Sequence, residues 1–361
     1  MRKKLVLIAA FIAILAFIIS GCKPAASPTK PVVTQTGPTV YTAGYYETDD
    51  TGPYYNPCYW AGTTMTNLYA DGYDGAAFGI TISAGTVYTA GYDEIGGAID
   101  SPCYWTGTTR HILPFGPGYE GYANALTIAN NEIYIAGNYE NTESPQQMTA
   151  CYWANGVEQD LTEEYDACAY GITVSGGTVY TAGYYQVSST AQHIACHWNG
   201  TTKIDLGSGS DAQAYGLALV NGVVYAVGYY NNGTNDVPCC WEGLLTRVDL
   251  PLNSSTYSGV ATSIFIYYGN IFIGGSYNNG MNDVPCYWTL AYTGTTETDM
   301  PGYGLNTAGD SWAIFVNNNT VYLGGTNGSD PFYGPCYWVN GAETDLPYGQ
   351  YDGEVYAIGV Q

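Results

Sequence analysis

One motif recurs seven times along the chain, and this repetition constrains the fold more than any other feature. A run of the type Val-Tyr-Thr-Ala-Gly, first seen at residues 40–44, is followed in every copy by Cys-x-Trp. Repeats that cover everything from residue 39 onward indicate one supersecondary unit used seven times. The tryptophans of the copies are spaced 43 to 50 residues apart: Trp60, Trp105, Trp153, Trp198, Trp241, Trp288 and Trp338.

Each copy contains four short strand-like runs. They are an Ala-x-Gly-Ile run such as residues 77–82, the Val-Tyr-Thr-Ala-Gly run, the Cys-Tyr-Trp run, and a run that ends in Asp-Leu, such as Asp205-Leu206. Turns rich in Gly and Asn separate the runs, as β-hairpins require. Four antiparallel strands per copy and seven copies predict an all-β fold, a seven-bladed β-propeller.

The last residues of the chain predict how the ring closes. Residues 355–360 match the run at residues 77–82, whereas the first copy, at residues 39–72, has only the other three runs. We therefore expect the C-terminal strand to complete the first blade, which removes the open sheet edges that a linear array would expose. A solenoid would also repeat, but its coils are shorter and its ends need capping units.

The repeat resembles the kelch-type propeller repeat and its bacterial surface relatives over residues 39–361. In kelch-like blades a strand ends in Gly-Gly and is followed by a Tyr and a Trp. Gly274-Gly275 and Gly324-Gly325 fit this pattern, whereas the other copies have Ala-Gly or Val-Gly, and Cys-Tyr-Trp replaces the usual spacing. The resemblance implies the propeller fold, and it does not carry over a specific function.

The N-terminal residues look like a bacterial lipoprotein signal. Three basic residues precede an unbroken apolar run of 15 residues, Leu5 to Ile19, which is shorter than the roughly 20 needed to span a bilayer. We expect residues 1–21 to be removed and Cys22 to be lipidated, with residues 22–37 as a flexible tether and 38–361 as the propeller. This places the protein in a bacterial cell envelope, lipid-anchored on the extracytoplasmic face. An ordinary signal peptide with a chance cysteine is the alternative.

The charge balance excludes one class of partner. The formal net charge is −23, and residues 39–361 contain all 31 acids but only three bases, Arg110, Lys203 and Arg247. So few bases cannot neutralise phosphates, which argues against nucleic-acid binding. The three bases hold the same place in the last run of their copies, where a charge protects the outer edge strand, so we interpret them as structural.

The cysteines predict neither disulfides nor a metal site. The seven cysteines of the Cys-x-Trp motif hold equivalent positions in separate sheets about 10 Å apart, which is too far for a disulfide, so we expect buried thiols. Cys168 and Cys240 lie outside this pattern and stay candidate reactive or pairing thiols. No C-x-x-C or neighbouring His completes a metal site. Oxygen ligands for calcium occur at Asp49, Asp50 and residues 231–236, but no loop has a full ligand pattern.

The parts that vary between copies are the candidate binding surface. Connections between the second and third runs, and between copies, emerge at one end of the ring and are long and irregular. Most acids and many tyrosines lie there, so we predict a recognition face on these loops. The alternative is that the acids only keep the protein soluble. The candidate residues are Glu47, Asp49, Asp50, Asp71, Asp74, Asp93, Glu94, Tyr46, Tyr54, Tyr55, Tyr185 and Tyr230.

No catalytic motif supports an enzymatic interpretation. The sequence has three histidines, and it has neither an HExxH motif nor the arginine cluster and box typical of sialidases. We therefore predict a membrane-anchored binding or scaffold protein, a monomeric ring that recognises an envelope or extracellular protein or glycan. Two alternatives stay open: a carbohydrate-active enzyme that uses paired loop carboxylates, and a structural envelope subunit.

Overall fold

The computed structural model describes residues 37–361 with short gaps, and residues Pro38–Gln361 form one compact unit. The described part contains no helix long and apolar enough to cross a membrane. The residues within this range that are not described are 49–54, 69–73, 97–98, 117–119, 142–146, 162–163, 208–210, 244–245, 255, 292–293, 304–306, 330–331 and 350.

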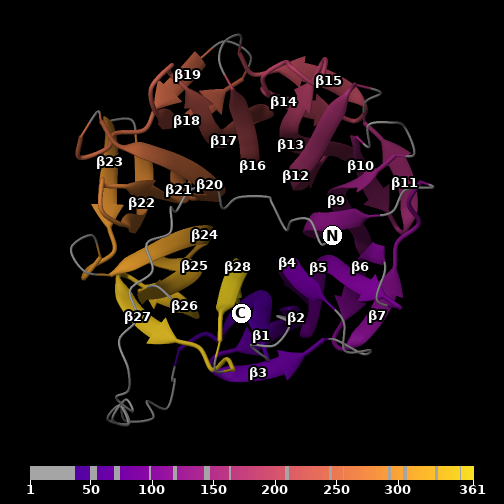
Figure 1. Cartoon of the computed structure of the whole chain (residues 1–361), viewed down its shortest axis with the longest axis horizontal. Coiled ribbons are helices and arrows are strands. Elements are labelled where there is room, and N and C mark those ends of the chain that lie inside the picture. The colour runs from indigo at the N-terminus through magenta and orange to yellow at the C-terminus, as the bar shows by residue number, and fades with distance from the viewer. Residues whose placement is uncertain are drawn as a thin grey trace, which may run out of the picture. The chain divides into compact units, whose positions relative to one another are not determined.

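The described residues form seven four-stranded antiparallel sheets. Each sheet is one blade, and Figure 1 shows the blades arranged radially around a central axis. From the inner to the outer strand, the blades are β28 (Gly353–Val360), β1 (Val40–Glu47), β2 (Tyr55–Ala61), β3 (Thr64–Asn67); β4 (Gly75–Ser83), β5 (Thr86–Ile95), β6 (Ile99–Thr106), β7 (Thr109–Ile112); β8 (Gly121–Ala129), β9 (Glu132–Glu140), β10 (Met148–Ala154), β11 (Val157–Asp160); β12 (Asp166–Ser175), β13 (Thr178–Gln186), β14 (Ile194–Asn199), β15 (Thr202–Asp205); β16 (Ala212–Val220), β17 (Val223–Asn231), β18 (Asp236–Glu242), β19 (Thr246–Asp249); β20 (Ser258–Tyr267), β21 (Asn270–Asn278), β22 (Asp283–Ala291), β23 (Gly294–Asp299); β24 (Ala308–Asn317), β25 (Thr320–Ser329), β26 (Phe332–Val339), β27 (Ala342–Asp345).

The C-terminal strand closes the ring, as the sequence predicted. β28 pairs with β1 from Val40↔Val360 to Tyr46↔Gly353, and Thr39 and Gln361 exchange two further backbone hydrogen bonds. Contacts between neighbouring inner strands run without a break around the ring, from β28 to β4 and on through β24 back to β28. The expected seven-bladed propeller with a composite first blade is therefore confirmed.

The two ends of the ring differ in their connections. One end carries tight turns, such as Asn221 (φ 50°) and Gly222 (φ 82°), whose left-handed backbone is what a two-residue hairpin requires. We call this end, which also carries Gln361, the short-turn face; its described turns lie at residues 62–63, 84–85, 107–108, 130–131, 155–156, 176–177, 200–201, 221–222, 268–269, 318–319 and 340–341. The opposite end, where the chain passes from second to third strands and between blades, is the long-loop face.

The core lies between adjacent blades and is built from the repeated motif. The seven tryptophans and the seven cysteines of the Cys-x-Trp motif are all buried, and the described cysteines carry free thiols. Tryptophan side chains also join neighbouring blades, since the Trp60 indole N–H donates to the Pro347 carbonyl at 2.8 Å and Trp288 donates to Pro251 at 2.7 Å. Buried side chains thus fill the blade interfaces, which leaves the two ends of the ring and its central channel as candidate sites.

Candidate functional site

Part of the predicted recognition face lies outside the described residues. These predicted residues are Asp49, Asp50, Tyr54 and Asp71, together with the lipid-attachment residue Cys22. The remaining eight candidates are described, and their contacts separate them into groups with different roles.

Asp74 belongs to a set of acids that join neighbouring blades. It precedes β4 by one residue, and its carboxylate accepts the Tyr55 backbone N–H at 3.1 Å, at the start of β2 in the preceding blade. Asp166, Asp211 and Asp352 accept the corresponding N–H groups of Met148, His193 and Tyr333 at 2.8 to 3.0 Å. Because an acid recurs at this place in several copies, we interpret its role as joining blades. Comparison of the copies in the sequence could have indicated this role.

Four of the candidates occupy the same position in different blades, near the end of the second strand: Tyr46, Asp93, Tyr185 and Tyr230. The Tyr185 hydroxyl donates to Asp205 at 3.1 Å, and the Tyr230 hydroxyl donates to Asp249 at 3.0 Å, both within their own blades. Burial, with the nearby Asp205 carboxylate, raises the pKa of Tyr185 to about 12. Tyr46 and Tyr185 are buried, so these rings support the outer strands more than they face solvent.

In the second blade, Asp93 replaces this tyrosine and forms a buried ion pair. Asp93, which is only 2% exposed, accepts a hydrogen bond from Arg110 of the outer strand β7. The other two bases are paired as well: Lys203 with Glu164 at 2.5 Å and Arg247 with Asp249 at 3.0 Å. Each also lies over the tyrosine of its blade, 3.4 Å from the ring centre. All three bases after residue 39 are therefore matched by acids.

Glu47, Tyr55 and Glu94 keep part of their surface open at the long-loop rim. Burial, with the neighbouring Asp352 carboxylate, raises the pKa of Glu47. The Glu94 carboxylate accepts the Asp74 backbone N–H at 3.3 Å, and the Tyr55 ring packs edge-on against Tyr45 with centroids 4.6 Å apart. Of the described candidates, these three, Asp74 and Tyr230 are partly exposed, so a partner could touch them.

Two acids on inner strands were missed by the sequence analysis. Asp310 of β24 and Glu354 of β28 occupy equivalent positions on neighbouring inner strands, two residues before a β-bulge. Burial raises the pKa of Glu354 to about 7, although hydrogen bonds from Tyr356 and Tyr45 act to lower it. Burial also raises the pKa of Asp310 to about 6. The other copies have Ala, Tyr, Cys, Gln or Val at this position, and that contrast was the available signal.

Every inner strand contains a β-bulge at the same place, and the extra residues form a collar around the channel. Bulged residues reach the next blade: the Tyr170 and Tyr215 rings lie 5.0 Å apart, Phe78 and Tyr356 lie 5.2 Å apart, and the Thr262 hydroxyl donates to the Ser311 carbonyl. A bulge redirects a side chain in this way. The collar residues are Phe78, Asn124, Tyr170, Tyr215, Thr262, Trp312 and Tyr356.

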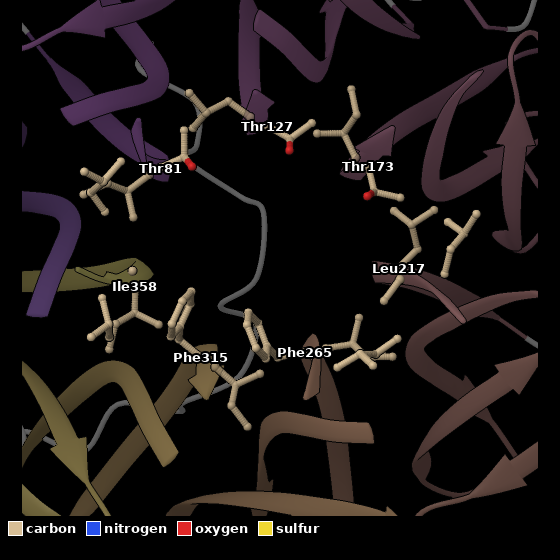
Figure 2. Close-up of a pocket in the computed structure, with 18 of the residues that line it drawn as sticks. Thr81, Thr127, Thr173, Leu217, Phe265, Phe315 and Ile358 are labelled. Atoms are coloured by element: carbon tan, nitrogen blue, oxygen red, sulfur yellow. The ribbon is translucent and has the colours of Figure 1, made fainter. Parts of the chain in front are cut away.

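A cavity of about 590 Å³ occupies the channel on the short-turn side of the collar. Its lining begins two residues beyond the bulge in every blade, for example at Ile80 after Phe78, and it ends at Gln361 (Figure 2). Most of the lining is aliphatic or aromatic, with threonines on three blades. The variable loops of the sequence give no sign of this cavity, because its lining lies on the inner strands.

The described residues offer little for metal chemistry: no group of three or more His, Cys, Asp or Glu side chains among them could hold a metal ion. His193 Nδ1 lies 2.6 Å from the Asp211 carboxylate, where it reinforces the blade junction described above. The His197 side chain is buried, and burial lowers its pKa.

Comparison with known proteins supports the fold and nothing more specific. No protein-family model matches the chain, and no curated protein matches it. A puromycin-hydrolyzing peptidase of Mycobacterium tuberculosis is similar over 85% of this chain and 53% of its own, with a TM-score of 0.55 and 9% identity. The chain therefore spans about half the length of that peptidase.

Two further solved structures are similar at lower TM-scores. An ulvan lyase of polysaccharide lyase family PL25 is 9% identical, with 78% of this chain and 81% of the other covered and a TM-score of 0.47. YjhT is 10% identical, with 74% and 96% covered and a TM-score of 0.44. Identities this low show similarity of fold alone.

Proposed function

We propose that the chain is a kelch-like lipoprotein of a bacterial envelope that binds a protein or glycan partner through its long-loop face. The observation that carries the proposal is uncompensated negative charge. Every base after residue 39 is ion-paired, whereas Glu47 and Glu94 stay partly open on the long-loop rim beside Tyr55. Such a rim suits a basic protein surface or an uncharged glycan, which aromatic rings and carboxylates both contact well.

The position of the first strand agrees with an anchored orientation. β1 begins at the short-turn face, where Val40 pairs with Val360. A chain anchored at Cys22 therefore enters the ring at the face opposite the long loops, which leaves those loops free to meet a partner. Cys22→Ala should move the protein from the membrane fraction to the soluble fraction, and retention on membranes would contradict the lipid anchor.

Variants that remove negative charge from one face or the other test the recognition surface. A binding partner is first isolated from envelope extracts or a glycan array by the folded unit Pro38–Gln361. Replacing Glu47 and Glu94 by Gln should then weaken its affinity about fivefold to tenfold and reduce the dependence on salt. The matched control, Glu132→Gln with Glu242→Gln, removes the same charge from the short-turn face and should leave affinity unchanged. Equal effects of both pairs would contradict the proposal.

A carbohydrate-active enzyme is the second candidate, and one observation favours it. Asp310 and Glu354 lie on adjacent inner strands, and burial holds the pKa of both within the range useful for general acid and base catalysis. Cleavage of a polysaccharide that is abolished by Glu354→Gln and by Asp310→Asn, in variants that still melt cooperatively, would establish this activity. Binding without cleavage by the unaltered protein would favour the first proposal.

A further inference from the structure

The cavity below the collar varies between blades at a single position. The first lining position is aliphatic in all seven blades, as in Ile80, Leu126 and Ile358, and these residues pack between blades. The next position changes from blade to blade. In chain order from the second blade, it is Thr81, Thr127, Thr173, Ala218, Phe265, Phe315 and Gly359.

This variation divides the cavity into two unlike walls. Figure 2 shows Thr81, Thr127 and Thr173 along one side and Phe265 and Phe315 on the other. The two phenylalanine rings lie 4.5 Å apart at an angle of 46°, so they form a continuous aromatic surface. Packing between blades needs no such division, because the aliphatic position beside it already provides the contact in each blade.

The charge and size of the cavity restrict what it can hold. None of the described side chains that line it is charged, although the chain carries 31 acids. Its 590 Å³ falls within the usual range for small-molecule sites. Two or three residues of each inner strand line it, for a depth of about 7 to 10 Å, so the mean width is about 9 to 11 Å. A cavity as wide as it is deep fits a compact ring system better than a single extended chain.

We propose that this cavity binds an uncharged small molecule of one or two ring systems. Its apolar face stacks on Phe265 and Phe315, and a hydroxyl, carbonyl or amine group meets the threonine hydroxyls on the opposite wall. The absence of charged side chains from the described lining matches a neutral ligand, since burying an unpaired charge among them would be costly. This site is separate from the long-loop face, so the failure of one proposal leaves the other intact.

The test uses N-phenyl-1-naphthylamine, a neutral fluorescent probe with two ring systems and one N–H group. Fluorescence titration of the folded unit Pro38–Gln361 should show saturable binding at one site. Replacing Phe265 and Phe315 together by Ala should weaken binding at least tenfold. Ala218→Phe, which fills the cavity and removes none of its contacts, should produce a similar loss. Thr127→Val should weaken binding about threefold, because it removes one hydroxyl and keeps the shape.

Controls separate this outcome from nonspecific binding. Tyr268→Ala alters an exposed aromatic residue on the same face that does not line the cavity, and it should leave probe affinity unchanged. Probe affinity that survives both the double Phe variant and Ala218→Phe would overturn the proposal. A version beginning at Lys23 should bind the probe as well as Pro38–Gln361 does. If Pro38–Gln361 binds the probe and the version that begins at Lys23 does not, residues 23–37 block the cavity. That result would also overturn the proposal.

Discussion

The two faces of the ring are made from the ends of the same strands, yet they differ sharply in charge. On the short turns and the strand ends beside them, the acids are Glu132 and Glu242, and each accepts a hydrogen bond from a tyrosine hydroxyl. The long-loop face and the inner strands near it carry many more carboxylates. Tight turns favour Gly, Asn and Thr, with Ala84 and Tyr268 as exceptions, whereas long loops are less restricted, so the two faces can change independently.

The largest expected effect comes from the same Gly-to-Ala change made toward each end of one blade. A Cβ at Gly183 would lie 1.8 Å from the Cys168 carbonyl oxygen, beside the bulge of β12, whereas a Cβ at Gly200 in a short turn meets nothing within 4 Å. Gly183→Ala should lower the free energy of unfolding by about 3 kcal/mol or more, because backbone must move. Gly200→Ala should cost about 1 kcal/mol, from its φ of 58° alone.

Denaturant unfolding of both variants measures this difference. Equal losses at the two positions would show that the bulge adds no constraint beyond an ordinary turn. The comparison also tests why the motif keeps Gly at residues 44, 91, 137, 183, 228, 275 and 325, where an added Cβ would meet a carbonyl oxygen of the inner strand at 1.7 to 2.1 Å.

The second prediction concerns pH and the inner end of the long-loop face. Burial raises the pKa of Glu354 from 4.5 to about 7. The folded protein therefore holds a proton that the unfolded chain releases, so the free energy of unfolding should fall as pH rises from about 4.5 to 7. The change should be on the order of 2 kcal/mol, since part of the side chain is exposed.

Glu354→Gln keeps the size of the side chain and removes the titration, so its unfolding curve should depend less on pH over this range. Chemical unfolding at several pH values measures the slope. Glu132→Gln on the short-turn face is the matched control and should follow the unaltered protein. A slope that Glu354→Gln leaves unchanged would rule out Glu354 as its source.

The smallest expected effect is a gain of stability on the short-turn face. Tyr268 has a φ of 49°, a left-handed backbone that is costly for a bulky residue, and its side chain is 88% exposed, with an edge-on contact to the neighbouring Tyr267 ring at 4.5 Å between centroids. Tyr268→Asn should raise the free energy of unfolding by about 0.5 to 1 kcal/mol, because Asn adopts this conformation more readily. Thermal denaturation measures the gain, and a loss would mean that the edge-on contact with Tyr267 stabilises the turn more than the left-handed backbone destabilises it.

The ring was predictable because the seven copies share one pattern, so that each copy could be compared with the others. The four runs, their order and the missing strand of the first copy together left one closed arrangement, which β28 completes. The roles of individual acids were less accessible. Asp74 lies on the predicted face, but its partner is the Tyr55 backbone N–H of another blade, and only the assembled ring brings those groups together.

Side-chain directions near the channel could not be predicted, for a physical reason. Alternation along a strand assigns each residue to a face, but one bulge reverses that assignment for every residue beyond it. Tyr170 and Trp312 therefore lie in the collar, and Thr81 and Phe265 line the cavity, in places that a regular strand would not give. Aligning the copies could still have revealed that residues 81, 127, 173, 218, 265, 315 and 359 vary where their neighbours do not.

The pairing of β28 with β1 has a consequence for how the protein is made. The first blade lacks its inner strand until residues 353–360 have been synthesised, so the ring cannot close before then. Until then, the other six blades can form, but the inner edge of β1 stays unpaired and can pair with other chains. In the proposed envelope location, export in the unfolded state would postpone closure until residues 353–360 have crossed the membrane.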